Sequence, residues 1–162
     1  MKNIYRLKHI IRYSNVSRIT NENVAEHSFM VAAIVIKLAN KYDFDIGKAT
    51  AMAVVHDFPE VYIDDVNHQV KRDYPKVAEA LKEAEKQIMI DKFSEVERAI
   101  YTAYESQVSA EAQIVKYADV LQCIQYAAHE ISLGNNGYMH TVMSEATALK
   151  IKLENRLKRY EK

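Results

Sequence analysis

The stretch Ala51-Met-Ala-Val-Val-His-Asp-Phe-Pro-Glu60 begins as an apolar run and ends in a histidine, a carboxylate, a proline and a second carboxylate. Its first half predicts a buried helix, and Pro59 ends that helix or begins a new turn. A charge beside a buried face is costly unless it is paired or holds a metal. We therefore interpret His56-Asp57 as half of a metal site, with the other ligands on helices far away in sequence.

Composition favours long helices. The chain has 162 residues, of which 49% are hydrophobic and 27% charged, and it contains only three glycines and two prolines. A sheet-rich fold needs many tight turns, which use these two residue types heavily. A chain of this length is also typical of one domain with a sizeable core. We expect an all-α fold, with residues 1–162 forming a single domain.

Charge and cysteine content limit the partners and the compartment. Lys and Arg together number 22, as do Asp and Glu, so no net charge recruits nucleic acid, whereas a local pocket can still bind a nucleotide. Cys123 is the single cysteine, which excludes an intramolecular disulfide and suits a reducing cytoplasm. The N-terminal residues have no apolar signal core. The apolar run at residues 31–36 is too short to span a bilayer, so we expect a cytoplasmic protein with no membrane partner.

Hydrophobic periodicity and cap residues predict the helices. Asn21 or Asn23 can cap the second helix, Asp45 the third, and Ser94 with Glu97 forms a capping box. Residues 60–73 are interpreted as a functional loop, or alternatively as a solvated connector. The expected helices cover residues 4–13, 22 or 24 to about 42, 46–56, 74–93, 95–104, 109 or 110 to about 133, and 138–160.

Three further polar residues are candidates for a functional site, and each also has a simpler structural explanation. His27 lies on the apolar stripe of its helix, where a histidine is more often a hydrogen-bonded core residue than a ligand. Asp119 lies in a mostly apolar stripe, so it needs an arginine, a cap or a metal, and a buried salt bridge would satisfy it equally. Arg12 follows a short helix and can simply complement the helix dipole.

Together, His27, His56, Asp57 and Asp119 form a mixed nitrogen and oxygen ligand set. Such a set suits an octahedral divalent Mn, Co, Fe or Ni ion with open positions, while Zn or Mg is also compatible. A closed structural zinc site would favour cysteines. Glu60 lies one turn beyond His56 and can orient a metal-bound water or shuttle its proton.

The order H…HD…D resembles that of the HD-domain metal-dependent phosphohydrolases, most closely their small 5′-deoxynucleotidase branch. The strings that carry this resemblance span residues 12 to about 136 and are Glu22-Asn-Val-Ala-Glu-His27-Ser28, His56-Asp57-Phe-Pro-Glu60-Val61, Lys116-Tyr-Ala-Asp119 and Gly134-Asn-Asn. The resemblance implies an all-helical bundle of about six or seven helices, whose members are often homodimers. It also implies one divalent metal ion and a small-molecule nucleotide substrate.

Roles follow from the same resemblance. His27, His56, Asp57 and Asp119 match the metal ligands, and Asp57 and Glu60 match catalytic acidic residues. The substrate-binding positions are Arg12 for the phosphate, Asp65 near the deoxyribose, and Tyr13, where tryptophan is typical. The loop following Asp65 lacks the prolines of the family pattern, which bears on the preference for deoxyribose.

These observations leave three hypotheses, in this order. The first is a phosphomonoesterase, in which metal-bound water attacks the phosphorus of a nucleoside 5′-monophosphate, with deoxynucleotides favoured. The second keeps the metal but acts as a nucleotide pyrophosphohydrolase or phosphodiesterase. The third is a non-catalytic nucleotide sensor or scaffold, which the intact ligand set disfavours.

Overall fold

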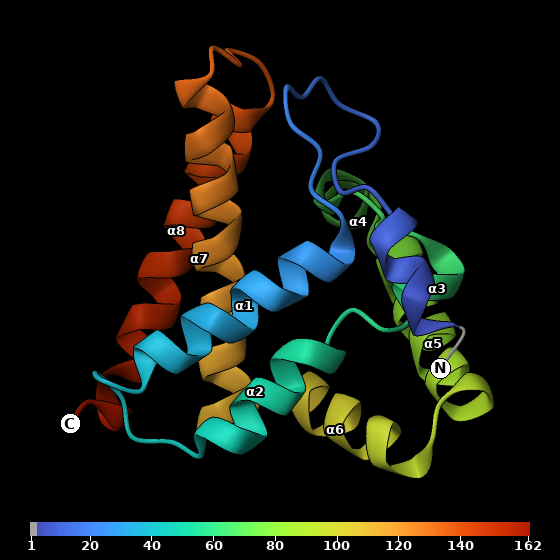
Figure 1. Ribbon diagram of the computed structural model, residues 1–162, viewed down its shortest axis with the longest axis vertical. Helices are drawn as coiled ribbons and strands as arrows, with labels where there is room; N and C mark the ends of the chain where they lie inside the picture. Colours follow the sequence, from blue (N-terminus) through green and yellow to red (C-terminus); the bar gives the residue numbers. More distant parts are fainter. Residues whose placement is uncertain (1–2) are drawn as a thin grey trace.

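The computed structural model describes residues 3–162, and over this range the chain is all-α, with eight α-helices and no strand (Figure 1). The all-helical bundle expected from the sequence is confirmed. The elements are the 3₁₀ helix Ile4–His9, α1 (Val24–Leu38), α2 (Ile46–Val55), α3 (Glu60–Ile63), α4 (His68–Asp73), α5 (Pro75–Lys92), α6 (Glu95–Ser106), α7 (Ala110–Ser132), α8 (Met139–Leu157) and the 3₁₀ helix Lys158–Tyr160.

Side-chain caps fix most helix starts where the sequence indicated them. The Asn23 side chain accepts from the backbone N–H of Glu26, and the Glu26 carboxylate accepts from the N–H of Asn23, which completes a capping box. Asp45 caps α2 by accepting from the N–H of Lys48 at 3.0 Å. A second capping box, Ser94 with Glu97, opens α6 (Glu95–Ser106). These caps satisfy backbone donors that would otherwise lack partners.

Two segments differ from the expectation. The predicted helix over residues 4–13 is only a 3₁₀ helix that ends at His9. The predicted loop over residues 60–73 contains two short helices, α3 and α4, separated by Asp64 with a backbone φ of 60°. The Asn67 side chain accepts from the N–H of Gln69 and so starts α4. A polar stretch with a capping asparagine therefore formed helix where its polarity alone had indicated a loop.

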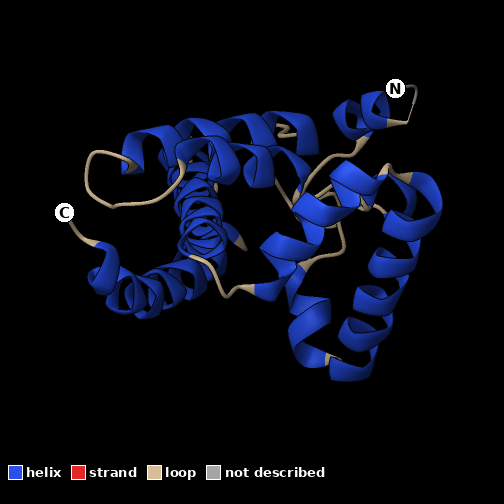
Figure 2. Ribbon diagram, turned by 90° about the horizontal axis from the view of Figure 1, so that it is seen from below, coloured by secondary structure: helices blue, strands red, loops and turns tan. Residues whose placement is uncertain are grey.

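The core is built around α7, which packs against α1, α2, α6 and α8 (Figure 1). Its buried side chains include Ile114, Val115 and Ala118, each with no exposed surface. Helices α5 and α6 pack against each other to one side of α7 (Figure 2). The chain from His56 to Glu60 leads from the core helix α2 towards α3, so it lies between these two parts of the bundle.

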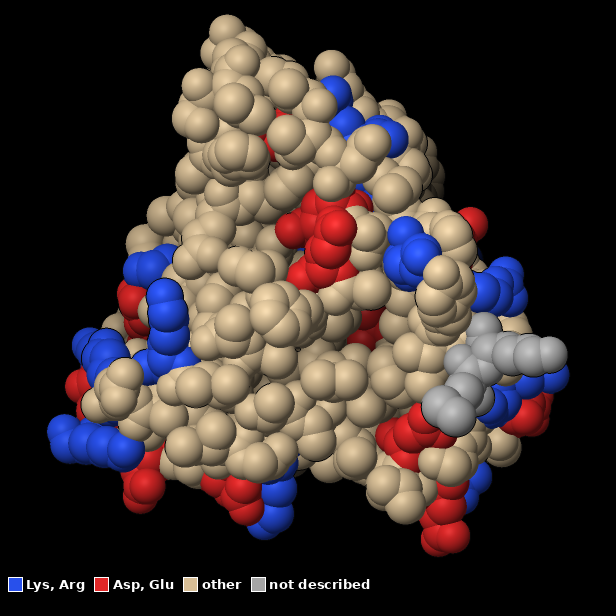
Figure 3. Space-filling view, in the orientation of Figure 1, with Lys and Arg blue, Asp and Glu red and all other residues tan. Residues whose placement is uncertain are grey.

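The face seen in Figure 3 carries few charges over α1, apart from an acidic group near the N-terminal end of that helix. Three apolar side chains of α1 are exposed: Phe29 by 70%, Ile36 by 56% and Met30 by 41%. Within the described part of the chain, none of the helices combines the length and the apolar character needed to cross a membrane.

Candidate metal centre

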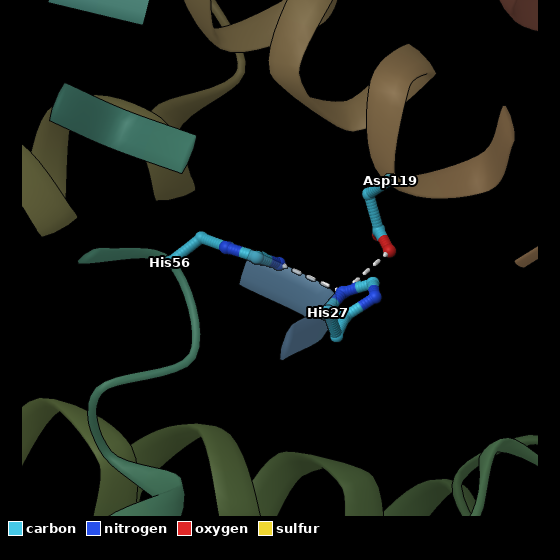
Figure 4. Close-up of side chains that lie close together, drawn as sticks. All are labelled: His27, His56 and Asp119. Atoms are coloured by element: carbon cyan, nitrogen blue, oxygen red, sulfur yellow. Dashed lines mark hydrogen bonds and ion pairs between the residues drawn. The ribbon is translucent and has the colours of Figure 1, made fainter. Parts of the chain in front are cut away.

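Both histidines singled out in the sequence meet Asp119 at one point (Figure 4). His27 comes from the buried face of α1, His56 from the end of α2, and Asp119 from the middle of α7. The Nε2 atoms of the two histidines are 3.3 Å apart, and His27 Nε2 is 3.3 Å from Asp119 Oδ1. Ligand atoms of these three residues all lie within 4.8 Å of one another.

Asp57 faces the same point from the turn after α2. Its Oδ2 atom lies 3.2 Å from His56 Nε2 and 3.5 Å from His27 Nε2. Ligands bound about 2.1 Å from one cation are roughly 3 Å apart, which is close to these separations. His27, His56 and Asp119 therefore present nitrogen and oxygen atoms in a spacing that fits a metal ion, and Asp57 adds an oxygen close to both histidines.

The other nitrogen of each imidazole is already in a hydrogen bond. His56 Nδ1 lies 2.8 Å from the carbonyl oxygen of Ala53, which only accepts, so Nδ1 carries the hydrogen. His27 Nδ1 lies 2.7 Å from Gln122 Oε1. Such bonds fix the ring orientation and leave Nε2 free as a ligand atom. Burial lowers the pKa of His56, which favours the neutral ring that binds metals.

Lys116 pairs with the carboxylate of Asp119, with 2.9 Å between Nζ and Oδ2. Burial by itself would raise the pKa of Asp119, but Lys116 and His27 outweigh it and hold that pKa well below its ordinary value. The aspartate is therefore ionised at neutral pH. Sequence reasoning did not assign Lys116 a role, although its position three residues before Asp119 on one helix face was a usable signal.

Glu60 is half-buried beside this cluster, and one of its oxygens is buried and unsatisfied. Its Oε2 atom has no hydrogen-bond partner among residues 3–162. Burial, together with the nearby charges of Asp57 and Asp65, raises the pKa of Glu60 well above its ordinary value. A buried polar atom without a partner is costly, so it is a site where a water or ligand is expected.

A cavity of about 590 Å³ opens onto these side chains. Its size is within the range of small-molecule sites. The lining residues are polar near the cluster and partly apolar towards α8; among them are Arg12, Tyr13, His27, Asp57, Glu60, Asp65, Lys71, Lys116, Asp119, Tyr138, Val142 and Leu149.

Arg12 points into this cavity instead of complementing a helix dipole. The 3₁₀ helix ends at His9, and the guanidinium reaches Glu22 Oε2 at 3.4 Å and Gln122 Oε1 at 3.3 Å. Its Nε atom lies 3.9 Å from Asp65 Oδ2. The reading of Arg12 as a simple dipole charge is therefore wrong, because carboxylates and an amide hold its side chain in place.

Tyr13 and Asp65 lie on either side of Arg12. The guanidinium carbon of Arg12 is 5.4 Å from the centre of the Tyr13 ring, which also stacks on Tyr126 at 5.4 Å. Tyr13 has a backbone φ of 55°, a conformation that costs energy for a residue with a side chain. Both predicted substrate residues thus lie at the cavity wall beside the arginine.

Sequence reasoning missed Glu22 and Gln122. Gln122 lies on the buried face of α7 with only 3% of its surface exposed, and Glu22 is 8% exposed just before α1. The signal that could have found Gln122 is its spacing: it is three residues after Asp119, so it shares that helix face. A polar side chain on a buried face needs partners, and here those partners are the site residues.

A family model described as 5′-deoxynucleotidase YfbR-like matches residues 1–159. A relative from Enterobacter sp. (strain 638), named as a 5′-deoxynucleotidase, is 33% identical over 146 residues, which cover 83% of this chain and 73% of the relative.

Solved structures have a similar fold. A crystal structure of a protein from Pyrococcus horikoshii OT3 superposes with a TM-score of 0.76 at 28% identity and covers 97% of each chain. An HD phosphohydrolase of cyanophage S-2L, bound to dA and one catalytic Zn²⁺ ion, has a TM-score of 0.66 at 20% identity, with 98% of this chain and 94% of that chain covered. At that identity, the likeness to the phage enzyme concerns the fold.

Proposed function

The chain belongs to the YfbR-like 5′-deoxynucleotidase family, and from this membership we propose that it is a divalent-metal-dependent hydrolase of nucleoside 5′-monophosphates, with deoxynucleotides preferred. One observation carries the proposal: His27, Asp57 and Asp119 line a cavity that also exposes Arg12 and Glu60, and His56 meets His27 and Asp57 directly behind its wall. Chain segments from three parts of the sequence had to meet for this arrangement to arise.

We propose that the two Nε2 atoms and the carboxylates of Asp57 and Asp119 hold one divalent cation. The mixed nitrogen and oxygen set suits Mn, Co, Fe or Ni, and Zn is the ion named in the structure of the phage enzyme. When bound, such an ion lowers the pKa of a water ligand and neutralises phosphate charge. The unsatisfied oxygen of Glu60 supports this assignment, because it needs a water at this position.

The protein side chains account for the rest of the reaction. Water adds to phosphorus, the bond between phosphorus and the 5′-oxygen breaks, and the products are phosphate and a nucleoside. Glu60 is placed to carry the proton from the attacking water towards the leaving oxygen, and its raised pKa makes its carboxylate a stronger base for that proton. Arg12 donates to phosphate oxygens and stabilises the charge that develops on them.

We propose that Asp65 and Tyr13 contact the nucleoside next to the phosphate. Asp65 lies beside Arg12, where its carboxylate can meet the sugar of a nucleotide whose phosphate the guanidinium holds. Asp64, directly before it, has a φ of 60°, so the chain is held in a costly conformation at this point. A ribose 2′-hydroxyl at this position would have to fit beside a fixed carboxylate, which is how a preference for deoxyribose would arise.

Phosphate release from a nucleotide panel tests the function. We expect the purified protein with Mn²⁺ or Co²⁺ to release phosphate from deoxynucleoside 5′-monophosphates, and more slowly from the ribonucleotides. Asp57→Ala should abolish the activity, because it removes a proposed metal ligand. Equal activity of both proteins would contradict the proposal, and release of pyrophosphate from triphosphates would favour the pyrophosphohydrolase alternative.

We also propose that two copies of the chain associate through the exposed apolar side chains of α1, Phe29, Met30 and Ile36. The scarcity of charge over α1 supports this choice, because two such faces can meet without burying unpaired charges (Figure 3). Sedimentation velocity should give the mass of a dimer, and a monomer at all concentrations would contradict this part of the proposal.

A further inference from the structure

One buried amide connects the proposed metal ligands to the proposed phosphate arginine. Gln122 Oε1 lies 2.7 Å from His27 Nδ1 and 3.3 Å from Arg12 Nη1. Its Nε2 atom donates to Glu22 Oε1, and the other oxygen of that carboxylate accepts from Arg12 at 3.4 Å. A single side chain therefore contacts His27 on α1, Arg12 after the first 3₁₀ helix, and Glu22 in the segment that leads into α1.

The polarity of these partners determines which way the amide faces. An arginine guanidinium has only donors, so the atom of Gln122 that faces Arg12 must be the oxygen. An ionised Glu22 carboxylate has only acceptors, so the atom that faces it must be the nitrogen. Both requirements give the same orientation, so the oxygen also faces His27.

The orientation of this amide determines the tautomer of His27. Because the amide oxygen accepts, His27 Nδ1 must carry a hydrogen, and in the neutral ring Nε2 then has a free lone pair. That lone pair points towards His56 and Asp119, which lie 3.3 Å away. The tautomer that a metal site requires is thus selected by a residue outside the cluster.

We propose that Gln122 is a positioning residue, which fixes the tautomer of His27 and the place of Arg12 with one amide group. This inference rests on the proposed function for the roles of those two residues. Gln122 can do this because it lies on the same helix as Asp119, three residues further on, so the orienting group and a cluster carboxylate belong to one rigid element.

The most direct test needs no substitution. In the metal-free protein at a pH above neutrality, the ¹⁵N chemical shifts of the His27 ring report which nitrogen is protonated. We expect a protonated Nδ1 and an unprotonated Nε2. The opposite tautomer in the wild-type protein would overturn the inference whatever the variants do.

Variants separate the two functions of the amide. Gln122→Met removes every polar contact at similar volume, and we expect it to weaken binding of Co²⁺ or Mn²⁺ alone by roughly 10- to 100-fold, measured by calorimetry. Gln122→Glu keeps an acceptor for His27 but places a second carboxylate beside Glu22. It should retain metal affinity within a few-fold while it raises the KM for a deoxynucleotide, because Glu22 loses its donor from residue 122, is repelled by the new carboxylate and no longer holds Arg12 in place.

Gln125→Met is the matched control, since Gln125 lies on the same helix but is exposed and does not line the cavity. Its metal affinity and KM should equal those of the wild type. Wild-type metal affinity in Gln122→Met would overturn the inference, as would equal losses in Gln122→Met and Gln122→Glu. The metal and NMR measurements do not require turnover, so the inference can hold even where the nucleotide panel shows no hydrolysis.

Discussion

Two glutamates with buried carboxylate oxygens, Glu130 and Glu60, differ in their hydrogen-bond partners. Glu130, with no exposed surface, accepts from the N–H of Ile19 at 2.7 Å, from the N–H of Thr20 at 2.7 Å and from its hydroxyl at 2.5 Å, and from the Asn135 amide at 2.8 Å. Burial would raise the pKa of Glu130, but these donors lower it to about 2. Glu60 keeps an unpartnered oxygen, and burial raises its pKa.

The hydrogen-bond partners of a buried carboxylate oxygen, more than its burial, therefore indicate whether the acid has a structural or a functional role. Glu130 joins the end of α7 to the loop at residues 19–20, so its partners belong to the fold. Glu60 lies at the wall of a cavity and has one carboxylate oxygen without a hydrogen-bond partner. The missing hydrogen bond costs stability, and it occurs where a substrate and water are expected. Substitution of Glu60 should therefore change mainly kcat, whereas substitution of Glu130 should change mainly the free energy of unfolding.

The largest expected effect is on turnover. Glu60→Gln removes the proposed proton carrier at almost the same volume, so kcat should fall by roughly 10²- to 10⁴-fold. Glu130→Gln, assayed at a temperature where it is folded, should keep kcat within a few-fold of wild type. Steady-state rates with a deoxynucleoside 5′-monophosphate measure both, and comparable kcat losses in the two variants would remove the distinction between the sites.

The second effect is on stability. Glu130→Gln loses the negative charge and brings a donor against donors, so the free energy of unfolding should fall by about 3 kcal/mol. Because the folded pKa is depressed, the contribution of Glu130 is present above its unfolded pKa and is lost as pH falls towards about 2. Urea denaturation at several acidic pH values measures this. A variant with wild-type stability at neutral pH would contradict the structural role of Glu130.

The smallest effect has the opposite sign. The folded pKa of Glu60 is raised, so the metal-free protein loses stability as pH rises above the unfolded value of about 4.3. Glu60→Gln carries no charge, so near neutral pH it should melt at a slightly higher temperature than wild type. Thermal melts of the two metal-free proteins across this range measure the difference. A variant that is less stable than wild type would show that Glu60 has partners in solution.

Local signals in the sequence predicted much of the fold. Asn23, Asp45 and Ser94 cap helices where their positions indicated, because capping depends on a few neighbouring residues. The burial of His27 also followed from its place on an apolar stripe, and it is 1% exposed. Hydrophobic periodicity and helix-capping residues are local features of the sequence, so they can be recognised without knowing the tertiary structure.

The parts that were missed depend on contacts between distant segments. Gln122 belongs to no recognisable sequence motif. Its hydrogen-bond partners lie about a hundred positions earlier in the chain, at Arg12, Glu22 and His27. Arg12 was equally compatible with a helix dipole until its carboxylate and amide partners were placed. In the segment at residues 60–73, polarity indicated a loop, whereas the Asn67 cap starts a short helix there.

The position of the bound ion decides whether the four side chains form a metal site. A crystal grown with Mn²⁺ or Co²⁺ and measured at the absorption edge of that metal locates the ion by its anomalous signal. We expect one ion about 2.1 Å from Nε2 of His27 and His56 and from carboxylate oxygens of Asp57 and Asp119. An ion bound elsewhere, or an unchanged cluster with Asp119 still paired to Lys116 and no anomalous peak among the four side chains, would contradict it.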